Sequence, residues 1–371
     1  MKTLSIRPLD IVFFRGNKLF GGPGEHAHSL MPPWPSVFSG ALRSLIISKN
    51  PDLWQQVHGK DKDLLDRLNK MLRVTAIGLQ QRDRTFFMPP KDLIFFKDQK
   101  GKLSVDILKV SDRPKGTSYD RKLPKVLTLD NKSKPAQGYW LTYKGLKQYL
   151  AGILPDTNEV VSVKDLWKTD YRLGIALDAD TWSAKEHAIY TSDAVVLAED
   201  TGFLVEVDSR DTPTGTIRLG GDGRAAQVIE NPKFKAPWRS DQLFNKLKNT
   251  DRFKVILATP GIFSQGWLIS GVEADDKGYF LRYKGLHAQL VCAKVQRYTT
   301  ISGWDLLHRR PKPAQRAVEA GSVYYFEVKR GTPEEFIQDV LDRGLWCLEE
   351  PDKQGESRRA EGFNNVWIGV W

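Results

Sequence analysis

The sequence predicts an α+β protein made of two units, each an antiparallel sheet with helices packed on one face. Two observations lead to this class. Each half of the chain runs from a strand pattern to a helix, then to further strands and a glycine-containing turn before a last strand. The length of 371 residues, with 40% hydrophobic side chains, is enough for two cores. Pro232, Pro237 and Trp238 interrupt the pattern, so we predict units of residues 1–235 and 236–371.

The first unit begins with a strand over residues 3–14, in which Pro8 indicates an edge or a bulge. A loop rich in glycine and proline follows over residues 15–35. Ser36 stands just before an apolar helical face, so we predict a helix that Ser36 caps at its N-terminus. The other elements expected here are a helix over 61–72 and strands over 73–80, over 85–96 and within 171–210.

A basic segment interrupts the first unit. Residues 97–134 contain eleven Lys or Arg and five Asp or Glu, together with Pro114, Pro124 and several glycines and serines. We expect a mobile basic insertion, spanning about residues 97–150 in all. A solvated loop and a loop that contacts RNA both fit this composition.

The second unit carries clear helix signals. Ser240 is the expected cap of a short helix. In Thr332-Pro333-Glu334-Glu335, the threonine suits the N-cap and the proline suits the first helical position, and Gly344 suits the end of that helix. The remaining strands are expected over 253–258, 323–328 and 366–371. Residues 138–146 and 278–286 are identical at seven of nine positions, which indicates a recurring hairpin.

The charge balance favours a polyanionic partner. The chain has 56 Lys and Arg against 45 Asp and Glu, a net charge of +11, which suits nucleic acid or an acidic protein surface. Two cysteines, Cys292 and Cys347, do not make a disulfide framework, and there is no Cys-x-x-Cys pair for zinc. The first residues lack the apolar core of a signal peptide, and no apolar run is long enough to span a membrane. We therefore expect a cytoplasmic protein that needs no cofactor.

A glycine-rich turn is the clearest candidate for RNA binding. Gly220, Gly221 and Gly223 surround Asp222, and Arg224 follows directly. Such a turn can present backbone N–H groups to a phosphate while the arginine supplies positive charge. An ordinary tight hairpin turn is the other interpretation, although a hairpin needs only one or two glycines.

The loop over residues 15–35 offers two more candidates. A helix N-terminus at Ser36 attracts anions, and Arg15 and Arg43 could flank it. His26 and His28 could contact RNA, order the loop, or act as the acid and base of RNA cleavage. Metal binding is not expected, because Glu25, His26 and His28 lack a clear fourth ligand.

Aromatic side chains beside basic ones are the remaining candidate. Residues 294–316 contain six basic residues and one acid, and Trp304 precedes Arg309 in this stretch. Bases stack on aromatic rings in such surroundings, so Trp304 and Arg309 are candidate RNA contacts. Trp367 and Trp371 are expected to pack in the core instead.

Several motifs, taken in order along the chain, resemble the third subunit of the Cmr complex, the type III-B CRISPR RNA-guided effector. The resemblance covers nearly the whole chain. Its motifs are Ile6-Arg7-Pro8-Leu9-Asp10, Phe13-Phe14-Arg15, Pro32-Pro33-Trp34-Pro35-Ser36, Gly40-Ala41-Leu42-Arg43, the turn at 219–224, Thr259-Pro260-Gly261-Ile262-Phe263, Gly266-Trp267, Ser302-Gly303-Trp304-Asp305, Pro311-Lys312-Pro313, Arg316-Ala317-Val318 and Ala320-Gly321-Ser322-Val323-Tyr324.

The resemblance implies a RAMP-superfamily protein with two ferredoxin-like, RRM-related domains. It also implies a non-catalytic subunit that holds the 5′ handle of the crRNA and contacts the large signalling subunit and the adjacent backbone subunit. Target RNA is a further partner to consider. The turn over residues 361–365 has fewer glycines than the family pattern, which argues against phosphate binding there. Two alternatives stay open: a metal-independent endoribonuclease that processes guide RNA through His26 and His28, and a protein scaffold without RNA binding of its own.

Overall fold

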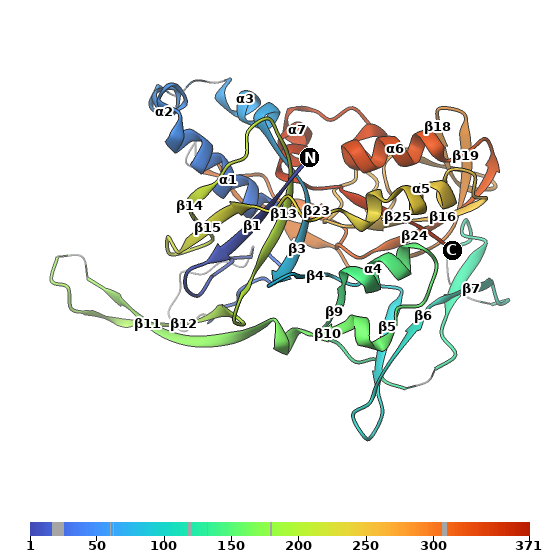
Figure 1. Cartoon of the computed structure of the whole chain (residues 1–371), viewed down its shortest axis with the longest axis horizontal. Coiled ribbons are helices and arrows are strands. Elements are labelled where there is room, and N and C mark those ends of the chain that lie inside the picture. The colour runs from blue at the N-terminus through green and yellow to red at the C-terminus, as the bar shows by residue number, and fades with distance from the viewer. Residues whose placement is uncertain are drawn as a thin grey trace.

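Two main antiparallel sheets lie next to each other, with most helices on one side of them and a long two-stranded arm projecting from one end (Figure 1). The computed structural model describes residues 1–16, 26–59, 61, 63–116, 120–131, 133–178, 180–305 and 310–371. No helix in this described part of the chain is long and apolar enough to cross a membrane. The α+β class with antiparallel sheets is confirmed.

The first main sheet has eight strands in the order β10-β9-β4-β3-β13-β1-β15-β14. Leu4 lies opposite Val205 on one side and Glu230 on the other, so β1 is a central strand although Pro8 suggested an edge or a bulge. Its strands are β1 (Lys2–Pro8), β3 (Leu72–Gln81), β4 (Arg84–Phe87), β9 (Tyr139–Thr142), β10 (Val160–Ser162), β13 (Thr201–Ser209), β14 (Gly215–Arg218) and β15 (Ala225–Glu230).

The second main sheet has six strands in the order β17-β18-β19-β24-β16-β25. Trp367 in the last strand is buried and stacks on Trp238, so it packs in the core as expected. Its strands are β16 (Arg252–Leu257), β17 (Val272–Asp275), β18 (Gly278–Tyr283), β19 (Leu286–Lys294), β24 (Val323–Arg330) and β25 (Val366–Val370).

The helices join the two sheets to each other. Helix α7 lies between β24 and β25 in the sequence, yet it packs against α1, α3 and β3 of the first sheet. Helix α4, which follows β9, packs against β25 of the second sheet. The helices are α1 (Pro35–Lys49), α2 (Pro51–His58), α3 (Leu64–Met71), α4 (Tyr143–Leu150), α5 (Asp241–Leu247), α6 (Glu334–Arg343) and α7 (Lys353–Glu361), with the 3-10 turns η1 (Thr157–Glu159), η2 (Val163–Asp165), η3 (Pro237–Arg239) and η4 (Gly344–Cys347).

Smaller two-stranded sheets lie outside the two main sheets, partly within the segment that we expected to be a mobile insertion. The described residues of 97–134 form most of two hairpins. Apolar residues such as Val105 and Val126 alternate with polar ones in these strands, a pattern that we overlooked because the segment is rich in charged residues. The pairs are β5 (Leu93–Lys97) with β6 (Leu103–Ile107), β7 (Lys109–Asp112) with β8 (Lys125–Thr128), β20 (Thr299–Ile301) with β23 (Gln315–Ala317) and β21 (Trp304–Asp305) with β22 (Arg310–Pro311).

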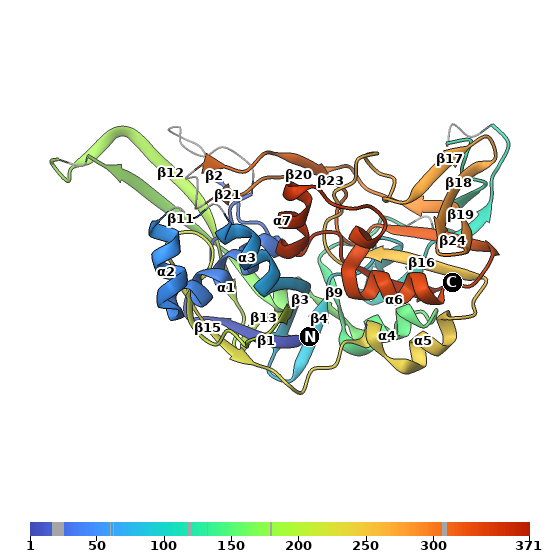
Figure 2. The same ribbon diagram turned by 90° about the horizontal axis from the view of Figure 1, so that it is seen from above.

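The arm is a third sheet of its own. It consists of β11 (Trp167–Leu177) and β12 (Ala184–Leu197), and the short strand β2 (His26–Ala27) pairs with β12 at its base. Figures 1 and 2 both show β11 and β12 extending well beyond the rest of the molecule. Because β2 pairs with the arm, His26 is fixed next to residues 165 positions further along the chain.

Two predicted helix starts are displaced by one or two residues. Helix α1 begins at Pro35 with Trp34 as its N-cap, so Ser36 is not the capping residue. Helix α6 begins at Glu334 with Pro333 as the N-cap, rather than with Thr332. In α1 the fixed φ of proline suits the first helical position and moves the start ahead of the serine. Ser240 does cap α5, because its hydroxyl accepts a hydrogen bond from the Leu243 N–H.

The repeated nine-residue segment folds in two ways. Residues 278–286 form the predicted hairpin, with Lys284 and Gly285 both at positive φ between β18 and β19. Residues 138–146 form β9 and then enter α4, because the Thr142 hydroxyl accepts from the Gly145 N–H and caps the helix. Arg282 stands at the matching position of the second copy and has no such cap to offer.

A buried acid links helix α4 to the second main sheet. The Asp92 carboxylate, fully buried ahead of β5, accepts hydrogen bonds from the hydroxyls of Tyr149 in α4 and Tyr325 in β24. The ammonium of Lys254 lies 3.7 Å from the same carboxylate and 3.5 Å from the centre of the Tyr149 ring. Burial lowers the pKa of Lys254 to about 8, although Asp92 opposes the shift. Asp92 thus holds helix α4 and strands β16 and β24 of the second sheet at one point.

We predict that Asp92→Ala destabilises the protein by about 3–5 kcal/mol, because it leaves a buried ammonium and two buried hydroxyls without their shared partner. Thermal unfolding measures the effect. Asp276→Ala, in an exposed turn between β17 and β18, is the control and is expected to change stability by less than about 0.5 kcal/mol. Equal melting temperatures for the two variants would contradict this role of Asp92.

Candidate nucleic-acid interface

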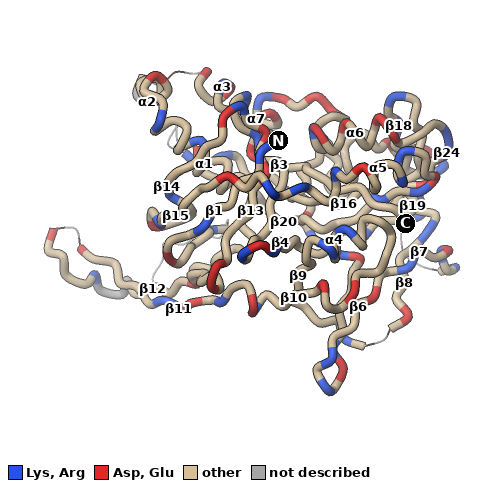
Figure 3. The backbone as a smooth tube through the Cα atoms, viewed as in Figure 1, with Lys and Arg blue, Asp and Glu red and all other residues tan. Residues whose placement is uncertain are grey.

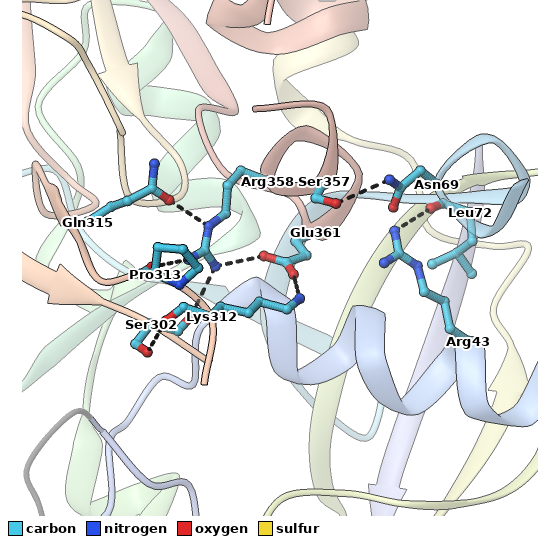
Figure 4. A network of polar contacts seen from close by, with 10 residues as sticks. All are labelled: Arg43, Asn69, Leu72, Ser302, Lys312, Pro313, Gln315, Ser357, Arg358 and Glu361. Atoms are coloured by element: carbon cyan, nitrogen blue, oxygen red, sulfur yellow. Dashed lines mark hydrogen bonds and ion pairs between the residues drawn. The ribbon is translucent and has the colours of Figure 1, made fainter. Parts of the chain in front are cut away.

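A buried arginine anchors the loop that carries Trp304. The Arg358 side chain in α7 is almost fully buried, and its guanidinium contacts the Glu361 carboxylate at 3.0 Å (Figure 4). It also donates to the Ser302 carbonyl, the Gln315 amide oxygen and the Pro313 carbonyl at 3.0, 2.8 and 3.2 Å. Its polar atoms therefore fix both ends of the segment between β20 and β23.

Lys312 completes this network. Its ammonium forms an ion pair with the second oxygen of Glu361, so one buried carboxylate serves two cations. The Arg358 guanidinium also lies 5.5 Å from the centre of the buried Phe363 ring. Buried charges are tolerated only when they are paired and hydrogen-bonded, so α7 and this loop are fixed together.

The anchored segment presents aromatic rings to solvent. We call residues 297–305 with 310–316 the aromatic–basic loop. Trp304 is 56% exposed and Tyr298 is 58% exposed, and the Arg316 guanidinium lies 4.6 Å from the centre of the Tyr298 ring. Exposed rings beside arginine are the surfaces on which single-stranded bases stack. Arg309 lies outside the described residues.

The net charge does not itself locate an interface. Figure 3 shows Lys and Arg interspersed with Asp and Glu over most of the described chain. Many of the cations are paired, among them Arg282 with Glu273 and Arg224 with Asp10. The candidate interface is therefore defined by exposed aromatic rings and the way they are held, with charge as a secondary feature.

The glycine-rich turn lies between β14 and β15, as the sequence indicates. Gly220 is at positive φ, and a side chain there would meet the Phe13 carbonyl at 2.5 Å. The Gly221 N–H donates to that same carbonyl at 2.7 Å. The Arg224 guanidinium pairs with Asp10 at 2.8 Å and is half-buried. Gly220 and Gly221 thus bring the turn against its own chain, and Arg224 reaches the surface as part of an ion pair.

The candidates around the start of α1 do not form one cluster. Arg15 is exposed, and its backbone bridges to Ser29. Ser36 is the second residue of the helix. Arg43 lies two turns further along and is only 7% exposed, where it donates to the Leu72 carbonyl. Burial lowers the pKa of Arg43 to about 10, although Glu361 opposes the shift. Arg43 is therefore a core residue and does not flank the helix N-terminus as we expected.

His26 and His28 meet a carboxylate that the sequence did not indicate. Asp193 of β12 lies 2.8 Å from the nearest nitrogen of each imidazole, and the two rings are 4.3 Å apart between centroids. Burial would raise the pKa of Asp193, but the two imidazoles outweigh it and the pKa lies below its ordinary value. Glu25 lies outside the described residues.

The arm adds an exposed apolar face next to these histidines. Tyr171, Leu173 and Ile175 occupy alternate positions of β11 and so share one face. Tyr171 is 77% exposed, and its ring centre lies 6.4 Å from that of His26. In Figure 2 the labels of β12, β2, β21, β20 and β23 follow one another along the upper side of the molecule. The arm and the aromatic–basic loop therefore lie along one side.

Sequence reasoning missed four of these residues for identifiable reasons. Tyr298 and Tyr171 look like ordinary strand aromatics until their exposure is known. Asp193 and Arg358 stand in unremarkable sequence, and their partners lie 165 and up to 56 positions away. Contacts between residues so far apart in the chain cannot be predicted from a local sequence pattern.

The turn over residues 361–365 is built into the core. Asn364 exchanges hydrogen bonds with the backbone of Ile262, and Asn365 donates to the Val74 carbonyl. Both asparagines are almost fully buried. A side chain at Gly362 would meet Val74 at 2.9 Å, so glycine is required where this turn passes the first sheet.

The fold is shared with solved CRISPR proteins. A chain in a cryo-EM structure of type III-B Cmr-beta bound to cognate target RNA and AMPPnP matches with a TM-score of 0.53 and 15% identity. A chain in the structure of type III-B Cmr-beta bound to cognate target RNA gives a TM-score of 0.51, again at 15% identity. Both matches cover 98% of this chain and 96% of the other. No curated protein sequence matches the chain.

These matches define the class: an α+β protein with the fold of a type III-B Cmr subunit. The sequence model of the CRISPR-associated Cas_Cmr3 proteins matches residues 4–371. The chain belongs to the Cas_Cmr3 family, and the resemblance drawn from its motifs is confirmed.

We predict that Arg358→Ala destabilises the protein by about 3–5 kcal/mol, because it leaves Glu361 buried with one of its two cations gone. The aromatic–basic loop should also lose its anchor, so its amide hydrogens should exchange faster. Urea unfolding and hydrogen exchange measure the two effects. Arg359→Ala, one residue further along α7, removes a partly exposed pair with Glu356 and is expected to cost less than about 1 kcal/mol. Slow exchange in the loop of the Arg358 variant would disprove the anchoring.

Proposed function

We propose that this protein is a non-catalytic guide-RNA-binding subunit of a type III-B CRISPR effector complex. In this role it holds the 5′ handle of the crRNA and contacts the large signalling subunit and the adjacent backbone subunit. Membership of the Cas_Cmr3 family supports the assignment to the complex. The observation that carries the RNA-binding role is the pair of exposed rings, Trp304 and Tyr298, on a loop anchored by buried Arg358.

We further propose that each main sheet is a ferredoxin-like RAMP domain, with the boundary near residue 235. The strand order supports this. In the first sheet β1 lies between β13 and β15, and in the second β16 lies between β24 and β25. A first strand between the third and fourth is the order of the ferredoxin-like core. Helix α1 follows the first strand in one sheet, and α6 precedes the last strand in the other.

Rigidity of the loop is central to the proposed mechanism. Stacking a base on an exposed ring stabilises a complex by about 1–3 kcal/mol, and a ring that is already held in place loses little entropy on binding. Arg297 and Arg310 are exposed on the same loop and suit phosphate contacts. Fixed stacking positions would set the register of the guide for the subunits that follow.

The absence of catalysis is part of the proposal. General acid and base groups must reach the reacting atoms, whereas His26 Nε2 and His28 Nδ1 both face Asp193. The test is incubation of the protein with 5′-labelled guide RNA, with and without its handle, over a series of salt concentrations. We expect handle-dependent, salt-sensitive binding and intact RNA. A cut product that disappears in His26→Ala would make the protein an endoribonuclease, and no binding at all would favour a protein scaffold.

We predict that Trp304→Ala weakens binding of handle-containing guide RNA about tenfold, in line with the loss of one stacked base. Fluorescence anisotropy measures the affinity. Trp54→Ala is the matched control, because Trp54 is similarly exposed at 53% but belongs to α2, which is not part of the aromatic–basic loop. The same affinity for both variants would remove Trp304 from the interface.

We predict that Arg224→Glu also weakens guide RNA binding, without unfolding the protein, since Arg224 and Asp10 are both at the surface. The loss should be similar for all sequences, and the salt dependence should become shallower by about one ion if Arg224 contacts a phosphate. Asp10→Asn removes the other half of the pair and should bind RNA at least as well as the unaltered protein. Unchanged affinity in Arg224→Glu would leave the glycine-rich turn as an ordinary hairpin turn.

A further inference from the structure

We propose that His26, His28 and Asp193 form a binding site for a divalent transition-metal ion of the zinc type. The site lies where β2 joins the base of the arm. It is independent of the proposed RNA-binding role, because none of its ligands belongs to the aromatic–basic loop.

Strand pairing brings the three ligands together. His26 of β2 lies opposite Thr191 of β12 in a parallel pair, and Ala27 lies opposite Ser192. The next residues in this register are His28 and Asp193. Alternate residues of a strand point to the same face, so the two imidazoles share a side, and the buried Ala27 points the other way.

The ligand atoms are close enough to hold one ion. One nitrogen from each histidine and one carboxylate oxygen all lie within 4.8 Å of one another. Ligands of tetrahedral zinc at about 2.1 Å from the metal lie about 3.4 Å apart, which falls within this span. Two imidazoles and one carboxylate are a recognised zinc ligand set that leaves a fourth position open to water or another ligand.

The carboxylate is the strongest reason to infer a cation. Asp193 is only 8% exposed, and its Oδ1 and Oδ2 atoms lie 2.8 Å from His26 Nε2 and from His28 Nδ1 respectively. A buried carboxylate with an imidazole nitrogen beside each of its oxygens brings the ligand types that zinc prefers to one point.

Thr191 supports the same assignment from outside the ligand set. Its hydroxyl oxygen lies 2.7 Å from His26 Nδ1. Histidine ligands usually donate their second N–H to such a partner, which fixes the ring and leaves the other nitrogen for the metal. In that tautomer Nε2 carries the lone pair, and it lies on the side of the ring that faces Asp193, where the ion would bind.

Two nitrogen ligands favour zinc over magnesium or calcium, which prefer all-oxygen sites. The ion would link strands 165 residues apart in sequence and so hold the base of the arm to the body. We therefore expect metal binding to stabilise the protein as well as to occupy the site.

The experiment uses the full chain, treated with a chelator and then titrated with zinc chloride in a calorimeter. We expect one equivalent of zinc to bind and the melting temperature to rise with zinc. His28→Gln and Asp193→Asn should each weaken zinc binding at least about tenfold, since the loss of even an outer-shell partner costs that much. Cobalt substitution should give visible absorption bands that both variants lose.

The control is Asp170→Asn. Asp170 lies in β11 at the base of the same arm, and its side chain pairs with Arg172. Its cross-strand neighbour is Ala194, whereas Asp193 lies opposite Tyr171. It should bind zinc like the unaltered protein. The His28 side chain is 57% exposed, so His28→Gln should fold even if Asp193→Asn does not, as circular dichroism will show. No zinc binding by the unaltered chain, or undiminished binding in folded His28→Gln, would overturn the proposal.

Discussion

The contact of Arg358 with Glu361 is the interaction on which the architecture depends most. Both groups are almost completely buried in α7, and a buried ion pair is stable only when its remaining polar atoms are also satisfied. Here the partners are the Ser302 and Pro313 carbonyls, Gln315 and Lys312. The charge pair therefore determines where α7 lies and also how the aromatic–basic loop leaves the second sheet.

Helix α7 connects the Arg358 network to the first sheet. It packs on α1, α3 and β3, and directly after it Gly362 lies against Val74 and Pro35. Asn365 then donates to the Val74 carbonyl before the chain enters β25. The turn that the family pattern would offer to phosphate is thus used to join the two sheets. Contacts of this kind position exposed Trp304 relative to the whole molecule, and not only to its own loop.

The arm depends on a comparable long-range contact. Its apolar face is exposed, so little packing holds it, and its base is fixed where β2 pairs with β12. Val12 adds a backbone bridge to Val195 nearby. The cluster of His26, His28 and Asp193 lies at this junction, which is why a metal there would act on the arm. The aromatic–basic loop and the arm are therefore each held in place by contacts at their base, the loop by Arg358 and the arm by the pairing of β2 with β12.

The sequence by itself determined the elements whose signals are local. Apolar alternation located β1, β3 and β13 of the first sheet and β16, β24 and β25 of the second. Ser240 marked the start of α5, and the glycines at 220–223 marked the turn between β14 and β15. The ordered motifs also indicated the family. These signals succeed because strand periodicity, capping and positive φ are properties of neighbouring residues.

Only the tertiary structure decided which polar residues act together. Arg43 was expected to flank a helix N-terminus but is buried, Arg358 was not singled out in the sequence and is also buried, and Asp193 contacts histidines far away in the chain. The repeated segment shows the same limit, since one copy becomes a hairpin and the other a helix that Thr142 caps. Burial and long-range pairing depend on which distant residues meet in the folded chain, and a local sequence pattern contains no information about that.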